Sequence, residues 1–381
     1  MNKETVFIAG NSNNIWTKLF VEHVLLKNNY EIYVQRELSK NGEYHEFYLN
    51  NGVKYYADYR VHRSILSIPK IKSIATDYKK IHSIDNRLHF NKVFIIYSSI
   101  THIKCALRAA DSTSEINAIF LGSDLFRASE KKLKTMQKVF NSKKIRIVCV
   151  SDNLANFYNL RFRGVKSTIE DVIDFGDAQI PEIDKYIKDG YSSAKKKMGI
   201  HPDKITITIG YNAKPQQQHE AVINSLASFP HEVKERLFLI LPMTYNGSEL
   251  YINKIRRVLS NSGIEYKILN TYMNSSEMAL LWVATDVLIH AQTTDALSFS
   301  MLEAIYAGCN VLNGSWLKYP EFEKWGIILP EFSSFVELRD RIDSLVNTGI
   351  VRDRSSKDII YKHASWETCE EKWKTLLNTQ V

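Results

Sequence analysis

The sequence predicts an α/β protein made of two successive series of strands and helices. At 381 residues the chain is longer than a single hydrophobic core comfortably accommodates, so two domains are expected. Short apolar runs rich in β-branched residues alternate along the chain with longer amphipathic stretches, a pattern typical of parallel sheets covered by helices. Residues 176–190 are polar and contain Pro181, which indicates a linker between the two series.

The first series is expected to occupy residues 1–178. Apolar or alternating runs predict its strands at 5–9, 31–35, 45–49, 93–97, 116–121 and 145–150. Apolar residues at helical spacing predict its helices at 15–26, 65–84, 100–110 and 129–146. The last of these helices is basic, because lysines crowd the face opposite its apolar residues.

The second series is expected at residues 179–355. Its predicted strands are 205–209, 237–241, 265–269, 286–291, a strand that begins at 311 and a weak one at 327–329. Its predicted helices are 191–198, 218–227, 251–259, 276–284, 298–307 and 335–346. Residues 356–381 form a separate tail, in which Ser365-Trp366-Glu367 precedes an amphipathic helix.

Composition excludes several classes of protein. No apolar run approaches the roughly 20 residues that span a bilayer. The N-terminus leads directly into a predicted strand and has no signal-peptide pattern. The four cysteines are widely spaced, which suggests neither a disulfide framework nor a metal site. The expected location is therefore the cytoplasm.

Charge is distributed unevenly between the two halves. Residues 1–175 contain 27 Lys and Arg against 17 Asp and Glu, whereas the remainder contains 23 against 25. The basic first half suits an anionic partner, such as the inner face of the plasma membrane or a lipid pyrophosphate. The alternative is a basic surface that faces solvent and binds no partner, which is common. No aromatic–basic signature of nucleic-acid binding is present, so no nucleic-acid partner is expected.

The stretch 286–313 contains the principal candidate site. A strand, a polar loop, a helix and another strand follow one another, and parallel sheets bind ligands at the carboxyl ends of their strands. Asp295 in the loop and Glu303 in the helix are eight positions apart. The intervening amides lack intrahelical acceptors and, with the helix dipole, favour an anion; they belong to Ala296, Leu297, Ser298, Phe299 and Ser300. This combination suits a nucleotide sugar, but two solvated acids on an ordinary helix would give the same pattern.

Two further candidates lie in the first half. Asp124 and Arg127 follow the predicted strand 116–121, at the sheet edge where chemistry is often placed. Asp124 suits a base or a ligand for an acceptor hydroxyl, and Arg127 suits a phosphate, but a helix cap explains Asp124 equally well. His102 follows the strand 93–97, where a structural role is the alternative to a catalytic one.

At this point the sequence resembles a known family, the GT-B glycosyltransferases of the family-4 type. Their donor-site signature is an acid, seven residues and a glutamate, followed by an alanine-containing helix and a Gly-Cys-Asn-Val-like run, here Gly308–Val311. This chain has Asp295 where the family usually has glutamate, and 297–300 replace the usual glycines. The Gly-Ser-Asp loop ending at Asp124 is similar to loops of bacterial surface-polysaccharide glycosyltransferases, and the Ser-Trp-Glu tail is similar to the family's C-terminal helix.

The resemblance implies two Rossmann-like domains facing across a cleft, with the last helix crossing back to the first domain. It implies that Glu303 holds the ribose and Asp295 the sugar. The loop with Gly210 and Lys214 would serve the donor pyrophosphate, and Tyr272 lies in the loop expected beside the nucleobase. Tyr245 is a candidate contact to base or phosphate, with simple packing as the alternative.

The expected activity is transfer of a sugar from a nucleotide-sugar donor to a glycan or a polyprenyl-pyrophosphate-linked acceptor, as in O-antigen or capsule synthesis. The sequence has no Asp-x-Asp, so neither a metal nor another cofactor is expected. The acid-x7-Glu signature is associated with retention of configuration, whereas the Asp124 loop also resembles inverting enzymes. The alternatives are a nucleotide-sugar epimerase, a non-catalytic nucleotide-sugar-binding subunit and a nucleotide-dependent oxidoreductase, which the missing glycine fingerprint disfavours.

Overall fold

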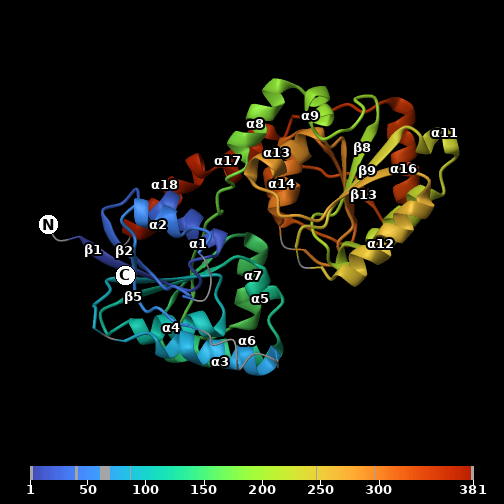
Figure 1. The fold of residues 1–381 in the computed structure, drawn as a ribbon. Coiled ribbons are helices and arrows are strands. Elements are labelled where there is room, and N and C mark those ends of the chain that lie inside the picture. The colour runs from blue at the N-terminus through green and yellow to red at the C-terminus, as the bar shows by residue number, and fades with distance from the viewer. Residues whose placement is uncertain are drawn as a thin grey trace. The chain divides into compact units, whose positions relative to one another are not determined.

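The computed structural model describes residues 3–38, 42–60, 69–85, 87–245, 247–295 and 297–378, with backbone alone at 69–72. The chain divides into two compact units, drawn in Figure 1. The first unit is Met1–Phe175 with Cys369–Val381, and the second is Gly176–Thr368. From the sequence, the boundary was expected after residue 178 and the returning segment from residue 356.

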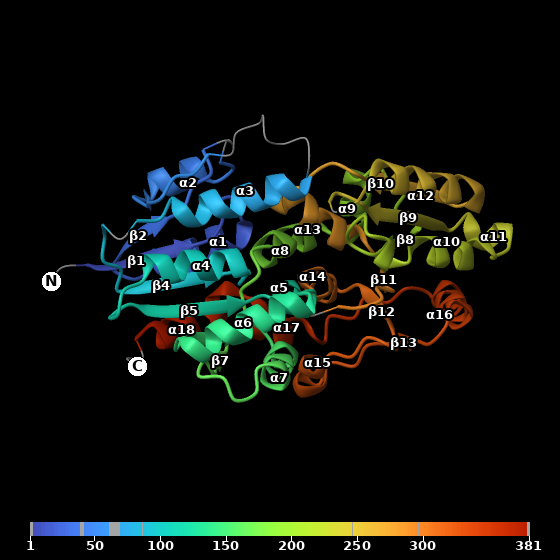
Figure 2. The same cartoon turned by 90° about the horizontal axis from the view of Figure 1, so that it is seen from below.

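The described part of the first unit forms a seven-stranded parallel sheet with the order β3-β2-β1-β4-β5-β6-β7. The strands are β1 (Glu4–Ala9), β2 (Tyr30–Val34), β3 (Lys54–Tyr55), β4 (Lys92–Ile96), β5 (Glu115–Phe120), β6 (Arg146–Cys149) and β7 (Ile169–Val172). The helices are α1 (Ile15–Phe20, continued by a π-helical turn, Val21–Leu25), α2 (His45–Asn50), α3 (Pro69–His82), α4 (Ile100–Ala109), α5 (Ser123–Phe126), α6 (Glu130–Ser142) and α7 (Asp152–Arg161). Figure 2 shows α3, α4 and α6 side by side over one face of this sheet.

One predicted strand of this unit is wrong. Residues 45–49 were expected to be extended, but they form the helix α2. Its one buried side chain is Tyr48, whose hydroxyl donates to the carbonyl of Ser12 at 2.9 Å, whereas Leu49 is largely exposed. A single buried residue in the segment cannot support the two-residue period of a half-buried strand. The strand of this region is instead the short β3 that follows.

The second unit forms a six-stranded parallel sheet in its described residues, with the order β10-β9-β8-β11-β12-β13. The strands are β8 (Ile205–Ile209), β9 (Leu237–Pro242), β10 (Glu265–Leu269), β11 (Val287–His290), β12 (Asn310–Gly314) and β13 (Glu331–Phe332). The helices are α8 (Ile180–Asp189), α9 (Tyr191–Lys197), α10 (His219–Ala227), α11 (His231–Lys234), α12 (Glu249–Ser262), α13 (Ser275–Ala284), α14 (Phe299–Tyr306), α15 (Pro320–Trp325), α16 (Phe335–Thr348) and α17 (Lys357–Ala364), with a short 3-10 turn at Pro215–Gln217.

Two predictions for the second unit are corrected. The polar stretch taken as a linker contains α8, because Ile180 and Ile183 lie on one face and pack into the core of this unit. Pro181 stands in the first turn of α8, where a missing N–H does no harm. The weak strand expected at 327–329 does not form, since Ile328 is 92% exposed; the strand is β13, which pairs with β12.

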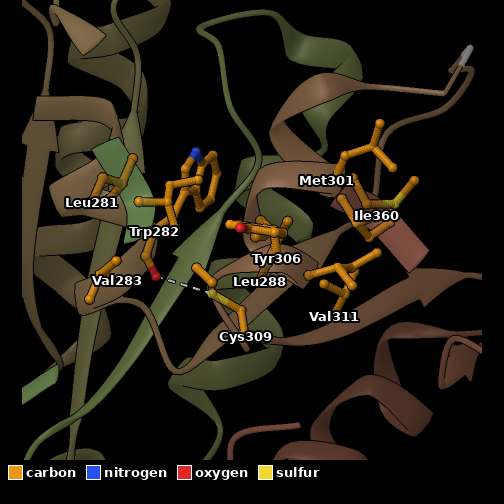
Figure 3. Close-up of a cluster of buried hydrophobic side chains, with 14 of the residues drawn as sticks. Leu281, Trp282, Val283, Leu288, Met301, Tyr306, Cys309, Val311 and Ile360 are labelled. Carbon is orange, nitrogen blue, oxygen red and sulfur yellow. Dashed lines mark hydrogen bonds between the residues drawn. The ribbon is translucent and has the colours of Figure 1, made fainter. Parts of the chain in front are cut away.

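Hydrophobic cores on the two faces of the second sheet hold this unit together. One core joins α8, α9, α13, α14 and α17, and the other joins α10, α12 and α16. Figure 3 shows the first of them, where Trp282, Tyr306 and Val311 converge and the Cys309 thiol lies 3.2 Å from the Trp282 carbonyl. Because helices cover both faces of the sheet, its central strands β8 and β11 are buried along their whole length.

The last helix, α18 (Trp366–Asn378), ends within the first unit. Trp373 is fully buried there against Phe20, with ring centroids 5.3 Å apart, and its indole N–H donates to the Asp174 carbonyl at 3.2 Å. The described helices include none that is both long and apolar enough to cross a membrane.

Candidate functional site

The candidate site lies at the carboxyl ends of β8 and β11, two adjacent parallel strands of the second unit. The loop 210–218 follows β8, and the loop 291–298 follows β11 and leads into α14. Strand order runs outward in opposite directions from this pair, which makes it the topological switch point of the sheet. Open α/β sheets bind their ligands at this point because the loops on either side diverge and leave a crevice.

Asp295 is the centre of a hydrogen-bonded network in these loops. Its Oδ1 lies 3.1 Å from the Tyr211 hydroxyl and 2.8 Å from Gln292 Nε2. Its Oδ2 lies 3.1 Å from the Tyr319 hydroxyl and 3.2 Å from His290 Nε2. The Asp295 side chain is only 5% exposed. Protein donors therefore surround both oxygens, although the Tyr211 hydroxyl also lies 3.1 Å from Gln292 Oε1 and His290 Nε2 also contacts Tyr319. A sugar hydroxyl that bonds to Asp295 would compete with these donors.

The protonation of the network follows from its surroundings. Burial, and secondly the Asp295 carboxylate, raise the pKa of Tyr211 and of Tyr319 above the usual range of a phenol. Both tyrosines therefore remain donors at neutral pH. His290 Nε2 also lies 2.9 Å from the Tyr319 oxygen, so the Nε2-protonated tautomer donates toward both neighbours.

The loop after β8 is tied to the loop after β11 at several points. Gln217 Nε2 donates to Gln292 Oε1 at 2.6 Å, and Gln218 Nε2 donates to the Ala291 carbonyl at 2.6 Å. Gly210 has a φ of +63°, and a Cβ there would lie 2.6 Å from Gln217 Oε1. Gly210 is thus needed for the turn and for the close approach of Gln217. Lys214 is half-buried in the same loop.

The N-terminus of α14 has the form expected of an anion site. Ser298 is its N-cap, and the Ser298 hydroxyl accepts the Met301 N–H at 3.3 Å. Phe299 and Ser300 are the first two helical residues and are half-buried, as is Leu297, which packs on the adjacent core. Ala296, also predicted to contribute an amide, lies outside the described residues.

Glu303 lies apart from the Asp295 network, on the side of α14 that packs into the core. Its Oε2 accepts the Trp282 indole N–H at 2.5 Å, and its carboxyl group neighbours that of Asp177. Burial, and then the adjacent Asp177, raise the pKa of Glu303 well above its usual value. Burial likewise raises the pKa of Asp177 to about 7. The two carboxyl groups therefore hold at least one proton between them near neutral pH.

The two tyrosines predicted as ligand contacts are solvent-exposed. Tyr245 is 50% exposed, and its carbonyl accepts the Ala213 N–H at 3.0 Å, which connects the loop after β9 to the loop after β8. Tyr272, in the loop after β10, is 74% exposed.

The candidates in the first unit have mainly structural contacts. Asp124 is buried in α5 and accepts backbone N–H groups from Ser98 at 2.8 Å, Gly122 at 2.9 Å and Leu121 at 3.1 Å. Burial raises the pKa of Asp124 to about 6, and these hydrogen bonds limit the rise. The N-cap of α5 is Gly122, so Asp124 holds the turn through both oxygens without being the cap residue. Arg127 is exposed at the end of α5.

His102 is a half-buried, neutral imidazole. Its Nδ1 lies 2.9 Å from the Tyr97 carbonyl and its Nε2 lies 3.0 Å from Lys80 Nζ. Burial, and secondly the Lys80 charge, lower the pKa of His102 to about 3. With both ring nitrogens engaged, this histidine fixes the end of β4 against α3.

Comparison with known proteins identifies the fold. No family model and no curated protein sequence matches the chain. HepE from Anabaena, solved with UDP and glucose, is similar with a TM-score of 0.70 and 11% identity over 100% of both chains. A glycosyltransferase from Rickettsia africae is similar with a TM-score of 0.70 and 13% identity over 100% of both chains. WaaG, a glycosyltransferase involved in lipopolysaccharide biosynthesis, has a TM-score of 0.60 and 12% identity, with 99% of this chain and 100% of WaaG covered.

The chain has the GT-B fold. The prediction of two Rossmann-like series is confirmed, since both units have a parallel sheet whose order turns at its first strand. At identities of this size the similarity concerns the fold, and residue roles rest on the contacts of this chain.

Within the GT-B fold, the sequence pointed to the loops after β8 and β11, but most of the side chains that connect these loops were not predicted. Tyr211, His290, Gln292 and Tyr319 were not singled out, and neither was Asp177, which borders Glu303. Polar residues at the ends of predicted strands, such as His290 and Gln292, were a signal that could have found two of them. Tyr319 lies 24 residues beyond Asp295, and no local pattern marks it.

Proposed function

We propose that this protein is a glycosyltransferase that transfers a sugar from a nucleotide-sugar donor to a glycan or lipid-linked acceptor of a bacterial cell-surface polysaccharide. One observation carries the proposal: the loops after β8 and β11 are bonded together beside the capped N-terminus of α14, at the switch point of a GT-B sheet. HepE, a structural neighbour, was solved with UDP and with UDP-glucose, and WaaG is involved in lipopolysaccharide biosynthesis.

The donor diphosphate is proposed to bind at the first amides of α14, from Leu297 to Ser300. The first N–H groups of a helix have no acceptor within that helix, and together with the positive end of the helix dipole they favour an anion there. Lys214 in the neighbouring loop adds a positive charge. Negative charge increases on the diphosphate as its bond to the sugar breaks, so the same groups would stabilise the leaving group. We assign the ribose to Glu303, as the resemblance suggests. Because Glu303 is only 6% exposed beside Trp282 and Asp177, a ribose hydroxyl would meet only the small uncovered part of its carboxyl group. Asp295 would act mainly by positioning the loop, because its two oxygens are already surrounded by protein donors.

We further propose that transfer needs no metal ion and retains the anomeric configuration. The sequence contains no Asp-x-Asp, and helix amides with Lys214 can supply the positive charge that a metal would otherwise bring. The acid-x7-Glu spacing of Asp295 and Glu303 supports retention. Asp124, bonded through both oxygens to backbone amides, is poorly placed to serve as the base of an inverting reaction.

The acceptor is proposed to be a polyprenyl-pyrophosphate-linked glycan bound by the first unit, with peripheral contact to the inner face of the membrane. The exposed side of α6 supports this, because Lys131, Lys132, Lys134 and Lys138 are all exposed there. Such a basic helix face attracts anionic lipid headgroups and pyrophosphate.

A thermal-shift titration without metal tests the donor site. Wild type, Lys214→Ala and the control Lys188→Ala, which alters an exposed lysine on α8, are titrated with UDP, GDP, CMP and dTDP in the presence of EDTA. One nucleotide should stabilise wild type by about 2.7 kcal/mol at a hundredfold excess over its Kd. Lys214→Ala should need several-fold more nucleotide, whereas Lys188→Ala should match wild type. No stabilisation by any nucleotide at millimolar concentration would contradict the proposal.

Turnover separates the transferase from its alternatives. A transferase releases the free nucleotide only when an acceptor is supplied. A nucleotide-sugar epimerase would change the sugar of the donor without releasing nucleotide, and a non-catalytic subunit would bind the donor without either change.

A further inference from the structure

The loop that follows β12, residues 315–319, approaches the Asp295 loop with two aromatic side chains. Tyr319 reaches the Asp295 carboxylate, and Trp316 Nε1 donates to the Gln292 carbonyl at 2.8 Å. Gln292 in turn donates from its side chain to Asp295 at 2.8 Å. Trp316 is therefore connected to Asp295, the centre of the network, through Gln292.

Trp316 is held in one position by three contacts. Its N–H bond to Gln292 fixes one edge of the indole. The ring meets Phe332 edge-to-face, with centroids 5.4 Å apart and planes at 89°. The rest of the indole lies against Gly314, where a Cβ would come within 2.4 Å of the Trp316 ring, so only glycine allows this approach.

The same side chain remains 39% exposed. By contrast, Trp282 and Trp373 are fully buried, and their role is packing in the core. An indole that is both immobilised and solvent-exposed presents a flat apolar surface whose ordering on binding costs little conformational entropy. Its ring face carries partial negative charge, which attracts weakly positive C–H groups, and one face of a pyranose ring consists of such groups.

We propose that Trp316 is the platform on which the pyranose ring of the donor nucleotide sugar lies. The inference rests on the proposed function and deepens it by naming a residue that recognises the sugar. The donor, and not the acceptor, is the expected occupant because Trp316 is bonded to the main chain of the segment that continues through Asp295 into the capped N-terminus of α14. Stacking leaves the hydroxyl groups at the ring edge free for hydrogen bonds.

Calorimetric titration of paired ligands tests the proposal. UDP and UDP-glucose are the first probes, and other nucleotides with their sugar conjugates follow if wild type prefers them. The variants are Trp316→Leu, which removes the platform, Trp316→Phe, which keeps an aromatic face but loses the N–H, and the control Trp325→Leu, at a half-buried tryptophan of α15 stacked on His363. Circular dichroism and thermal unfolding verify the fold of each variant.

Trp316→Leu should weaken binding of the nucleotide sugar by about five- to twentyfold while leaving the affinity for the free nucleotide within about twofold. Trp316→Phe should lie between wild type and Trp316→Leu, and Trp325→Leu should leave both affinities unchanged. Equal weakening of nucleotide and nucleotide sugar would overturn the proposal, because Trp316 would then only support the loop. A changed KM for the acceptor with unchanged donor affinity would also overturn it. If wild type bound neither ligand class, the proposed function itself would fail.

Discussion

At the scale of single residues, the least expected feature is the pair of buried carboxyl groups formed by Asp177 and Glu303. Asp177 Oδ1 accepts the Gln179 N–H at 2.7 Å, and Glu303 accepts the Trp282 N–H, but the described surroundings place no cation beside them. Burying two like charges is unfavourable, so the pair retains protons that each group would lose in water.

This pair should make stability fall as pH rises. Burial raises the pKa of Asp177 in the folded state to about 7, above the ordinary value of the unfolded chain. Between about pH 4 and pH 7 the folded state therefore holds a proton that the unfolded state has lost, and the free energy of unfolding decreases with pH. The contribution of Asp177 to stability is fully present below about pH 4 and is lost as the pH rises through about 7.

Asp177→Asn tests this effect, because an amide cannot ionise and can still accept the Gln179 N–H. The variant should gain about 1–3 kcal/mol more in free energy of unfolding at pH 8 than at pH 5, relative to wild type. Urea denaturation at both pH values is the measurement. Asp203→Asn, at a carboxylate that is 91% exposed, is the control and should show no such difference. Equal destabilisation by Asp177→Asn at both pH values would show that the carboxyl pair is not protonated as inferred.

At the scale of elements, α14 combines two roles that one residue can separate. Ser298 caps the helix through its hydroxyl, and the proposed diphosphate site uses the amides of the same turn. A cap needs only a side-chain oxygen, whereas an anion site also needs the absence of negative charge.

Ser298→Asp should therefore keep the cap but lose the ligand. Its stability should remain within about 0.5 kcal/mol of wild type, because aspartate and serine are comparable N-caps. Its nucleotide affinity should fall about tenfold or more, because a carboxylate beside the first amides repels a diphosphate. Ser298→Thr is the matched control and should retain both properties. Thermal unfolding and calorimetric titration measure the two effects, and unchanged affinity in Ser298→Asp would place the diphosphate elsewhere.

At the scale of the whole molecule, the uneven charge bears on where the protein works. The first 175 residues carry the basic excess, and α6 contributes exposed lysines at 131, 132, 134 and 138. The apolar face of α6 is occupied by packing, since Leu133, Met136 and Phe140 are buried. Contact with a membrane through α6 would therefore be electrostatic rather than insertive.

Vesicle sedimentation checks this form of contact. Wild type should bind vesicles with anionic headgroups at low salt and dissociate as salt increases, because the attraction is screened. Replacing the four α6 lysines by glutamine should weaken binding strongly, since each lysine near an anionic surface contributes about 1 kcal/mol. Replacement of Lys185, Lys188, Lys196 and Lys197 in the second unit removes the same charge and should have a much smaller effect. Equal loss in both variants would assign the effect to net charge alone.

Much of the fold could be predicted because its signals are local. Strands such as β4 and β11 contain short apolar runs, β8 is rich in β-branched residues, and α14 begins at a serine that can cap it. Prediction failed where burial depends on distant partners. The segment that forms α2 buries only Tyr48, and α8 reads as polar because its buried face is narrow.

The sequence by itself determined the α/β class, the two series of parallel strands and the loop that carries Asp295, since each depends on neighbouring residues and on the period of side-chain burial. Only the tertiary structure decided what surrounds the two acids. Tyr211 is 84 positions from Asp295. Asp177, at the start of the second unit, lies beside Glu303, which is far from it in the sequence. Their pKa values, hydrogen bonds and exposure arise from chain segments that only folding brings together, and sequence spacing carries no information about such contacts.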